Sequence, residues 1–162
     1  MHKIMRFIVF VKFGDANTCK RLGRYFSVNT RPNFSDEVLE TETELVDVFE
    51  FLPYPTITPV DSRTLLLYFE DDSDNNVEFD DIVSAVSLFS PSLLLSYSDF
   101  GDDEWYERYR DGRLELVWAV MGLDDPEDDE RMNRILSDET KARLRDVGDP
   151  ARILQLLAKE FT

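Results

Sequence analysis

The apolar and polar positions of the first part of the chain predict a strand followed by a helix. Residues 3–13 are rich in β-branched and aromatic side chains, which favours a strand. Asp15 or Asn17 then offers a side-chain cap for a helix that ends near Phe26. The apolar residues of this helix recur at helical spacing, so they form a single stripe.

Alternation and proline content organise the next part of the chain. Residues 39–51 begin as strict alternation with glutamate on one face, which predicts a second strand. Three prolines between residues 53 and 59 predict an extended, irregular stretch. The apolar run 64–70 is the best candidate for a central buried strand.

Helical spacing returns after an acidic stretch. Residues 71–78 predict a polar loop, and residues 79–89 predict an amphipathic helix that Ser90-Pro91 ends. Alternating apolar residues from Leu93 to Tyr97 then predict a fourth strand.

Asp111-Gly112 is the strongest hairpin signal in the chain, and it joins predicted strands at 104–110 and 113–120. A two-residue turn sets residues whose numbers sum to 223 opposite each other. The predicted pairs are Arg108 with Glu115, Tyr109 with Leu114, and Trp105 with Trp118. One salt pair and one aromatic pair emerge from this register, which supports it.

Helix-start signals dominate the remainder of the chain. Asp125-Pro126 begins a helix to about Leu136, Ser137 caps another to about Asp146, and Asp149-Pro150 begins the last one.

The order β-α-β-β-α-β, then a hairpin and helices, predicts an α+β fold. Specifically, it predicts a ferredoxin-like βαββαβ antiparallel sheet with both helices on one face. A β-hairpin and a C-terminal helical segment are added to it. We expect a single domain over residues 1–162, with a sheet core at 1–122 and helices at 123–162 packed on it.

Part of this pattern resembles a known group of proteins. The stretch 89–98 (FSPSLLLSYS), Gly101 with the aromatic residues after it, and 109–112 (YRDG) are similar to the end of a ferredoxin-like domain in uncharacterised phage and plasmid proteins. The resemblance covers roughly residues 60–120. It implies an origin in a mobile element and carries over no site.

The charge of the chain bears on what it can bind, because the net charge is −16 and is unevenly distributed along the sequence. Residues 1–31 have a net charge of +6, residues 32–130 of −24, and residues 131–162 of +2. Such acidity argues against direct binding to nucleic acid or to an anionic membrane and favours a basic protein or nucleoprotein partner. The alternative is that the acids only keep the protein soluble.

Composition also bears on the compartment. Cys19 is the only cysteine, so no intramolecular disulfide can form. The apolar run near the N-terminus is too short for a signal segment, and no stretch reaches the roughly 18 apolar residues of a membrane span. We therefore expect a cytoplasmic protein.

The residues for common catalytic chemistry are missing from the sequence. The single histidine, His2, is a poor general base, and Cys19 lies on an apolar stripe typical of core. No glycine-rich nucleotide motif is present. The run beginning at Asp72 starts like a calcium loop but has Val77 where glycine is needed and Val83 where glutamate is needed. We expect no catalytic residue, cofactor or metal, although a looser Mg²⁺ or Ca²⁺ site and a catalytic carboxylate pair stay open.

Acids beside aromatic residues form the candidate partner-binding surface. A strand ladder of glutamates, with acids from neighbouring loops, would imitate a track of phosphates. The candidate residues are Glu40, Glu42, Glu44, Asp71, Asp72, Asp74, Glu78, Asp102, Asp103, Glu104, Trp105 and Tyr106. Two simpler interpretations are also open: the acids prevent aggregation through the sheet, and the aromatic residues are ordinary core residues.

These observations favour a non-enzymatic inhibitor. It would occupy the nucleic-acid site of a basic partner, such as a nuclease or a defence complex, in the manner of an anti-CRISPR-like DNA mimic. The alternatives are a structural protein that forms a homo-oligomer, for example a homodimer through its sheet, and a small enzyme that uses carboxylates with Mg²⁺.

Overall fold

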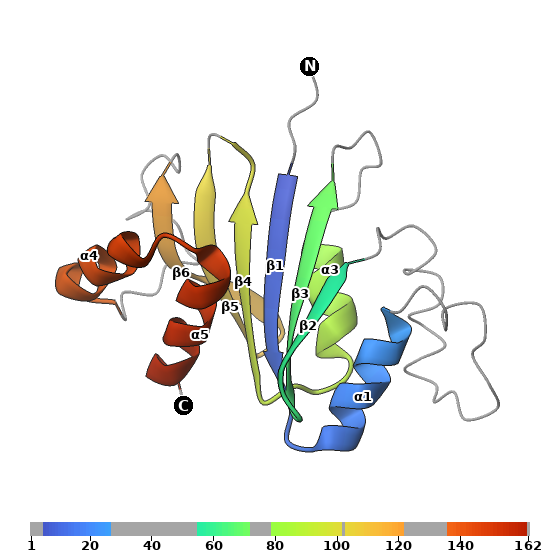
Figure 1. The fold of residues 1–162 in the computed structure, drawn as a ribbon. Coiled ribbons are helices and arrows are strands. Elements are labelled where there is room, and N and C mark those ends of the chain that lie inside the picture. The colour runs from blue at the N-terminus through green and yellow to red at the C-terminus, as the bar shows by residue number, and fades with distance from the viewer. Residues whose placement is uncertain (1–4, 27–54, 72–78, 102, 122–135, 162) are drawn as a thin grey trace.

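The structure is a computed structural model that describes residues 5–26, 55–71, 79–101, 103–121 and 136–161. Within these residues the chain is α+β (Figure 1). The strands are β1 (Met5–Lys12), β2 (Thr56–Asp61), β3 (Thr64–Asp71), β4 (Leu93–Asp99), β5 (Glu104–Arg110) and β6 (Arg113–Met121). The helices are α1 (Ala16–Tyr25), α3 (Phe79–Ser87), α4 (Asp138–Val147) and α5 (Pro150–Glu160).

The strands form one open sheet in the order β2-β3-β1-β4-β5-β6, and every neighbouring pair is antiparallel. β1 lies inside the sheet between β3 and β4 (Figure 1). Its sequence from Phe7 to Val11 is apolar without a break, and all five side chains are buried. A strand with this pattern is stable only where both faces of the sheet are covered.

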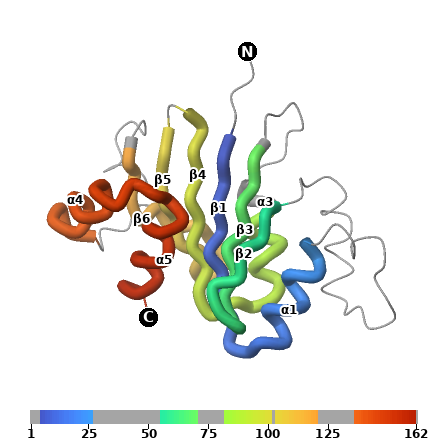
Figure 2. The backbone as a smooth tube through the Cα atoms, viewed as in Figure 1, coloured from blue at the N-terminus to red at the C-terminus, as the bar shows by residue number. Residues whose placement is uncertain are grey.

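Helices cover the two faces of the sheet, as the two figures show from the same side (Figure 2). On one face, α1 and α3 pack on the odd-numbered residues of β1 and β3, with Leu22, Leu67 and Ile82 fully buried. On the other face, α4 and α5 pack on β1, β4, β5 and β6. Each large side chain buried in these two clusters contributes about 1.5–3 kcal/mol.

Cys19 lies in the first cluster and is buried, as predicted. Burial, together with the charges of Asp61 and Asp15, raises the pKa of its thiol. The thiol is therefore a weak nucleophile in the folded protein.

The predicted caps of α1, α4 and α5 are confirmed, whereas the predicted cap Asp125 lies outside the described residues. The Asp15 carboxylate accepts a hydrogen bond from the Thr18 amide at 2.8 Å and begins α1. Ser137 caps α4, and Asp149 caps α5 with Pro150 in its first turn. Each side chain satisfies an amide that would otherwise have no partner inside the helix.

The prediction of an irregular proline-rich stretch is wrong for Thr56–Asp61, which is β2. The physical reason is its place at the edge of the sheet, where Pro59 need not donate a ladder hydrogen bond. The predicted strand at 39–51 and the predicted helix at 126–136 lie outside the described residues, apart from Leu136.

The predicted hairpin is confirmed near its turn and wrong farther away. Asp111 and Gly112 have φ values of 54° and 83°, as a tight two-residue turn requires. Arg108 is opposite Glu115, but a bulge between Tyr106 and Glu107 shifts the register by one residue. Trp118 therefore lies opposite Tyr106 instead of Trp105, and the Tyr106 and Trp118 rings stack with centroids 5.4 Å apart.

Candidate partner-binding site at one end of the sheet

A row of charged residues crosses four strands at one end of the sheet. Glu70 on β3 is the register partner of Arg6 on β1, Arg6 of Asp99 on β4, and Asp99 of Glu104 on β5. Register partners place their side chains on the same face of a sheet, here the face that α5 covers in part. We call these four residues the carboxylate row, and three of its members are acids.

The centre of the carboxylate row is an ion pair between Arg6 and Asp99. Two guanidinium nitrogens of Arg6 donate to Asp99 Oδ2, with Nε at 3.2 Å. The other carboxylate oxygen accepts from the Gly101 amide at 2.8 Å, which also fixes the start of the β4–β5 turn. The hydrogen bond from Arg6 to Asp99 raises the pKa of Arg6, although burial acts against it. Asp99 is therefore a structural anchor whose charge is already compensated.

Aromatic residues one step inward hold the outer two acids in place. Tyr68 Oη donates to Glu70 Oε1 at 2.7 Å, and Tyr97 Oη donates to Glu104 Oε1 at 2.8 Å. Burial raises the pKa of both tyrosines, and the adjacent carboxylates raise it further. Both hydroxyls consequently stay protonated as donors, and each carboxylate keeps its second oxygen for a partner.

The aromatic residues of the predicted surface separate onto the two faces of the sheet. Trp105 is half-buried, stacks on Phe100 with centroids 5.1 Å apart, and donates from Nε1 to Glu107 Oε1 at 2.6 Å. Tyr106 is 1% exposed and belongs to the core on the opposite face. Neighbouring side chains of a strand point to opposite faces of the sheet, so Trp105 and Tyr106 lie on different faces. Because Tyr106 is buried, a partner cannot contact it.

The described acids of the predicted surface gather at this end. Asp103 and Glu104 are half-buried, beside the exposed Glu70. Asp71 ends β3 at the same end, as register partner of Met5. The other predicted acids lie outside the described residues: Glu40, Glu42, Glu44, Asp72, Asp74, Glu78 and Asp102.

Sequence reasoning did not identify Arg6, Glu70 or Asp99 as members of this site. Arg6 and Asp99 are 93 positions apart, and only the strand order brings them together. The one available signal was a basic residue within an otherwise apolar strand.

The two ends of the sheet differ in the charged residues that they carry. β3, β4 and β6 end and β5 begins at the carboxylate row. Within the described residues, this end carries Glu70, Asp71, Asp99, Asp103 and Glu104 beside a single arginine, Arg6. The opposite end of the sheet carries Lys12, Arg63, Arg110 and Arg113 beside Asp61 and Asp111.

No group of three His, Cys, Asp or Glu side chains in the described residues is arranged to hold a metal ion. Among the described helices none has the length and apolar character that a membrane crossing needs. Comparisons with protein families, with curated proteins and with solved structures find no match for this chain.

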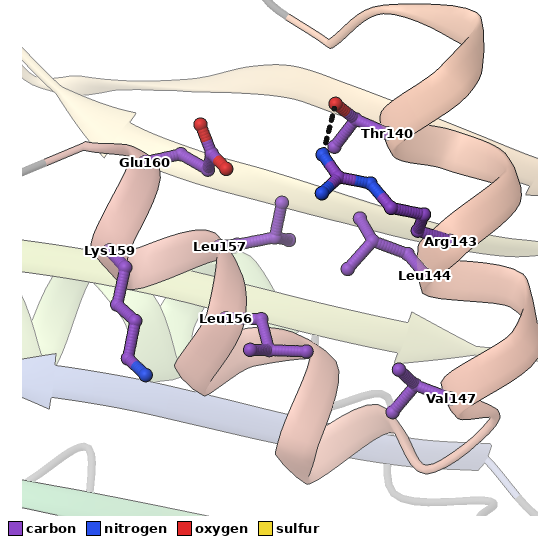
Figure 3. Close-up of a pocket in the computed structure, with 8 residues that line it drawn as sticks. All are labelled: Thr140, Arg143, Leu144, Val147, Leu156, Leu157, Lys159 and Glu160. Atoms are coloured by element: carbon purple, nitrogen blue, oxygen red, sulfur yellow. Dashed lines mark hydrogen bonds between the residues drawn. The ribbon is translucent and has the colours of Figure 1, made fainter.

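Two cavities lie away from the carboxylate row. The first, of about 260 Å³, opens between α4 and α5 over Leu144, Leu156 and Leu157, and Arg143 donates to Thr140 Oγ1 at its rim (Figure 3). The second, of about 380 Å³, lies at the opposite end of the sheet beside the β5–β6 turn. The first has an apolar floor, whereas arginine and serine side chains contribute to the wall of the second.

Proposed function

We propose that this protein is a non-enzymatic, acidic binding protein that inhibits a basic, nucleic-acid-binding partner by occupying its nucleic-acid site. The observation that carries the proposal is the carboxylate row, whose outer acids are held in fixed positions by tyrosine hydroxyls. Fixed acids lose little conformational freedom when a partner binds, so their charge is available for specific recognition.

The spacing of the acids suits a mimic of phosphates. Glu70 and Glu104 are separated by three strand-to-strand steps, which is about 14 Å. One DNA strand rises through about four phosphates over that distance. Asp103 adds a charge next to Glu104. Arginine and lysine side chains that line a nucleic-acid groove would meet carboxylates at comparable separations.

Electrostatic steering explains why the acids concentrate at one end. A cluster of one charge sign raises the association rate with an oppositely charged groove, and salt weakens this effect. Half-buried Trp105 follows Glu104 but lies on the other face of β5, so a partner that also contacts that face at this end of the sheet gains an aromatic contact in addition to charge. The partner class that fits is a nuclease or a nucleic-acid-binding defence complex, in the same compartment as this protein, for which we propose the cytoplasm.

We also propose a specific fold class for this α+β chain. We infer a ferredoxin-like arrangement because four strands have the order β2-β3-β1-β4, with α1 and α3 on one face. β5, β6, α4 and α5 would then be additions that build the second core cluster and one side of the carboxylate row. The resemblance of residues 60–120 to phage and plasmid proteins stays a prediction.

A triple variant tests the proposed surface. Glu70→Gln, Asp103→Asn and Glu104→Gln remove three charges, while the new amide oxygens of residues 70 and 104 still accept from Tyr68 and Tyr97. The matched control neutralises three exposed acids away from the row: Asp61→Asn, Asp111→Asn and Glu160→Gln. Both variants change the net charge equally, so only the location of the charge differs.

Each protein is immobilised and exposed to host lysate at low salt, and retained proteins are identified. We expect the unmodified protein and the control to retain a basic nucleic-acid-binding protein that duplex DNA or RNA and about 0.5 M salt displace. The triple variant should retain it at least tenfold less. Equal retention by all three proteins, or a partner that nucleic acid does not displace, contradicts the proposal.

The same experiment separates the alternative functions. Recovery of only a second copy of the chain, unchanged by salt, would favour a structural protein that forms a homo-oligomer. Stoichiometric Mg²⁺ in the folded protein, measured by equilibrium dialysis, would favour a carboxylate enzyme.

A further inference from the structure

A second candidate site lies at the end of the sheet opposite the carboxylate row. The 380 Å³ cavity opens where the α3–β4 connection, the β5–β6 hairpin and the end of α5 meet. We call it the hairpin pocket. Its volume falls in the range of small-molecule sites, about 300–1,000 Å³. It shares no residue with the carboxylate row, so the proposed function does not account for it.

Two arginines in the wall of the hairpin pocket are held by one carboxylate. Arg108 donates from Nε and Nη2 to Glu115 Oε2, at 3.2 and 2.8 Å. Arg110 approaches Glu115 Oε1 with Nε at 3.1 Å and Nη2 at 2.9 Å. A guanidinium has five N–H donors, so Glu115 leaves about three on each arginine. The carboxylate thus orients both cations without exhausting their donors.

Nearby carboxylates do not fully neutralise the two arginines, so an anion can bind beside them. Glu115 compensates one of the two arginines, and it is only 6% exposed. Asp111 lies 3.9 Å from Arg110, but its side chain is 89% exposed, so this contact is weak. The carboxylate row is a full strand length away, about 20 Å. This exceeds the Debye length of about 8 Å at physiological salt, so the distant acids are screened.

The α3–β4 connection adds hydroxyl groups to the same wall. Ser87 and Ser92 donate their hydroxyls to the backbone carbonyls of Ser84 and Lys12. Ser90 is exposed and has a φ of 54°, an uncommon conformation for a residue with a side chain. Ser90 lines the same cavity as Arg108 and Arg110, so its hydroxyl adds a donor to this wall.

The rest of the wall, apart from Asp111, is apolar and partly aromatic. Pro91, Leu93, Tyr109 and Phe161 contribute to it. The Arg108 guanidinium lies over the Phe161 ring, 4.5 Å from its centroid, which fixes the arginine from its other side. Inorganic phosphate would leave this apolar part unfilled, whereas a ring attached to the phosphate would pack against it.

We propose that the hairpin pocket binds a small phosphate monoester that carries an aromatic ring. Arg108, Arg110 and Ser90 bind the phosphate oxygens, and Tyr109 with the neighbouring apolar residues contacts the ring. A phosphate monoester offers three terminal oxygens to these three groups, and the planar guanidinium matches phosphate geometry. A carboxylate offers only two oxygens and satisfies fewer of these donors.

Phenyl phosphate is the probe, titrated into the full chain by isothermal titration calorimetry, with inorganic phosphate and benzoate as comparisons. We expect a Kd of about 1 mM or below for phenyl phosphate and at least fivefold weaker binding of both comparison ligands. No binding of phenyl phosphate at 10 mM overturns the site. Equal binding of benzoate overturns phosphate selectivity, and equal binding of inorganic phosphate overturns the role of the ring.

Variants locate the binding. Arg110→Gln should weaken phenyl phosphate at least tenfold, while Arg113→Gln, an exposed arginine across the same turn, should change it less than twofold. Ser90→Gly removes the hydroxyl and tolerates the positive φ, and should weaken binding about threefold. Thermal unfolding confirms that each variant is folded. Equal weakening by Arg110→Gln and Arg113→Gln would indicate general attraction to a basic end and overturn the proposal.

Discussion

Arg108 and Glu115 face each other across the β5–β6 hairpin and form an ion pair, with Arg108 Nη2 2.8 Å from Glu115 Oε2. Their side chains are only 11% and 8% exposed. Such a pair is stable as a unit, because either charge alone would be costly so far from water. Arg110 completes the arrangement on the other carboxylate oxygen.

Replacement of Glu115 should therefore be strongly destabilising at neutral pH. Burial opposes ionisation of Glu115, but the hydrogen bonds and charges of Arg108 and Arg110 outweigh it and lower the pKa of the carboxyl. Stability from such a group is present above its unfolded pKa and is lost as pH falls through the folded pKa. We expect Glu115→Gln to cost about 3 kcal/mol at pH 7 in urea unfolding.

The pH dependence is the control for that variant. The difference in unfolding free energy between the unmodified protein and Glu115→Gln should shrink as the pH falls below about 4. A difference that stays the same from pH 7 to pH 3 would show that the loss comes from packing and not from the carboxylate charge.

At the hairpin turn, backbone strain can be tested separately from steric clashes. An added Cβ would meet nothing within 4 Å at either Gly14 or Gly112, but only Gly112 has a positive φ, at +83°. Gly112→Ala should therefore lower the unfolding free energy by about 1–2 kcal/mol, and Gly14→Ala should have no such cost. Equal effects of the two substitutions on the denaturation midpoint would contradict the role of φ at position 112.

The hairpin also shows which residue pairs a local sequence pattern can predict. Asp111-Gly112 determines the turn, and the turn determines the pairs nearest to it, so Arg108 with Glu115 was predictable. The register changes where one extra residue enters β6 near Val117, and no residue type marks that bulge in the sequence. Trp118 therefore pairs with Tyr106, a contact that only tertiary packing selects.

Some acids of the candidate site could be predicted from the sequence, but their partners in the folded protein could not. The acids at 102–104 were identifiable because charge and aromatic residues coincide there. Tyr106 was misplaced because both faces of β5 have apolar or aromatic residues, and its core face depends on helices far along the chain. Asp99 acquires its partner Arg6 only from the strand order, which alternation within one strand cannot reveal.

Two tyrosines should respond in opposite ways to loss of the hydroxyl. Tyr97 Oη donates to Glu104 at 2.8 Å, whereas the buried Tyr106 Oη has no hydrogen-bond partner within the described part of the chain. Tyr97→Phe should lower the unfolding free energy by about 1–2 kcal/mol, and Tyr106→Phe should be neutral or stabilising. Urea unfolding of the two variants decides this, and a larger loss for Tyr106→Phe would reveal an unrecognised partner.

The last helix should contribute to the stability of the whole sheet. Leu154 on α5 is fully buried in the core cluster that α5 shares with β1 and β4, whereas Leu88 after α3 is 41% exposed. Leu154→Ala removes buried methyl groups and leaves a cavity, so we expect it to cost about 2–5 kcal/mol. Leu88→Ala should change stability by less than about 0.5 kcal/mol. The two values come from denaturation followed by far-ultraviolet circular dichroism, which reports on the sheet as well as the helices. If α5 were only loosely attached, Leu154→Ala would leave the main transition unchanged, and the carboxylate row would have to form without it.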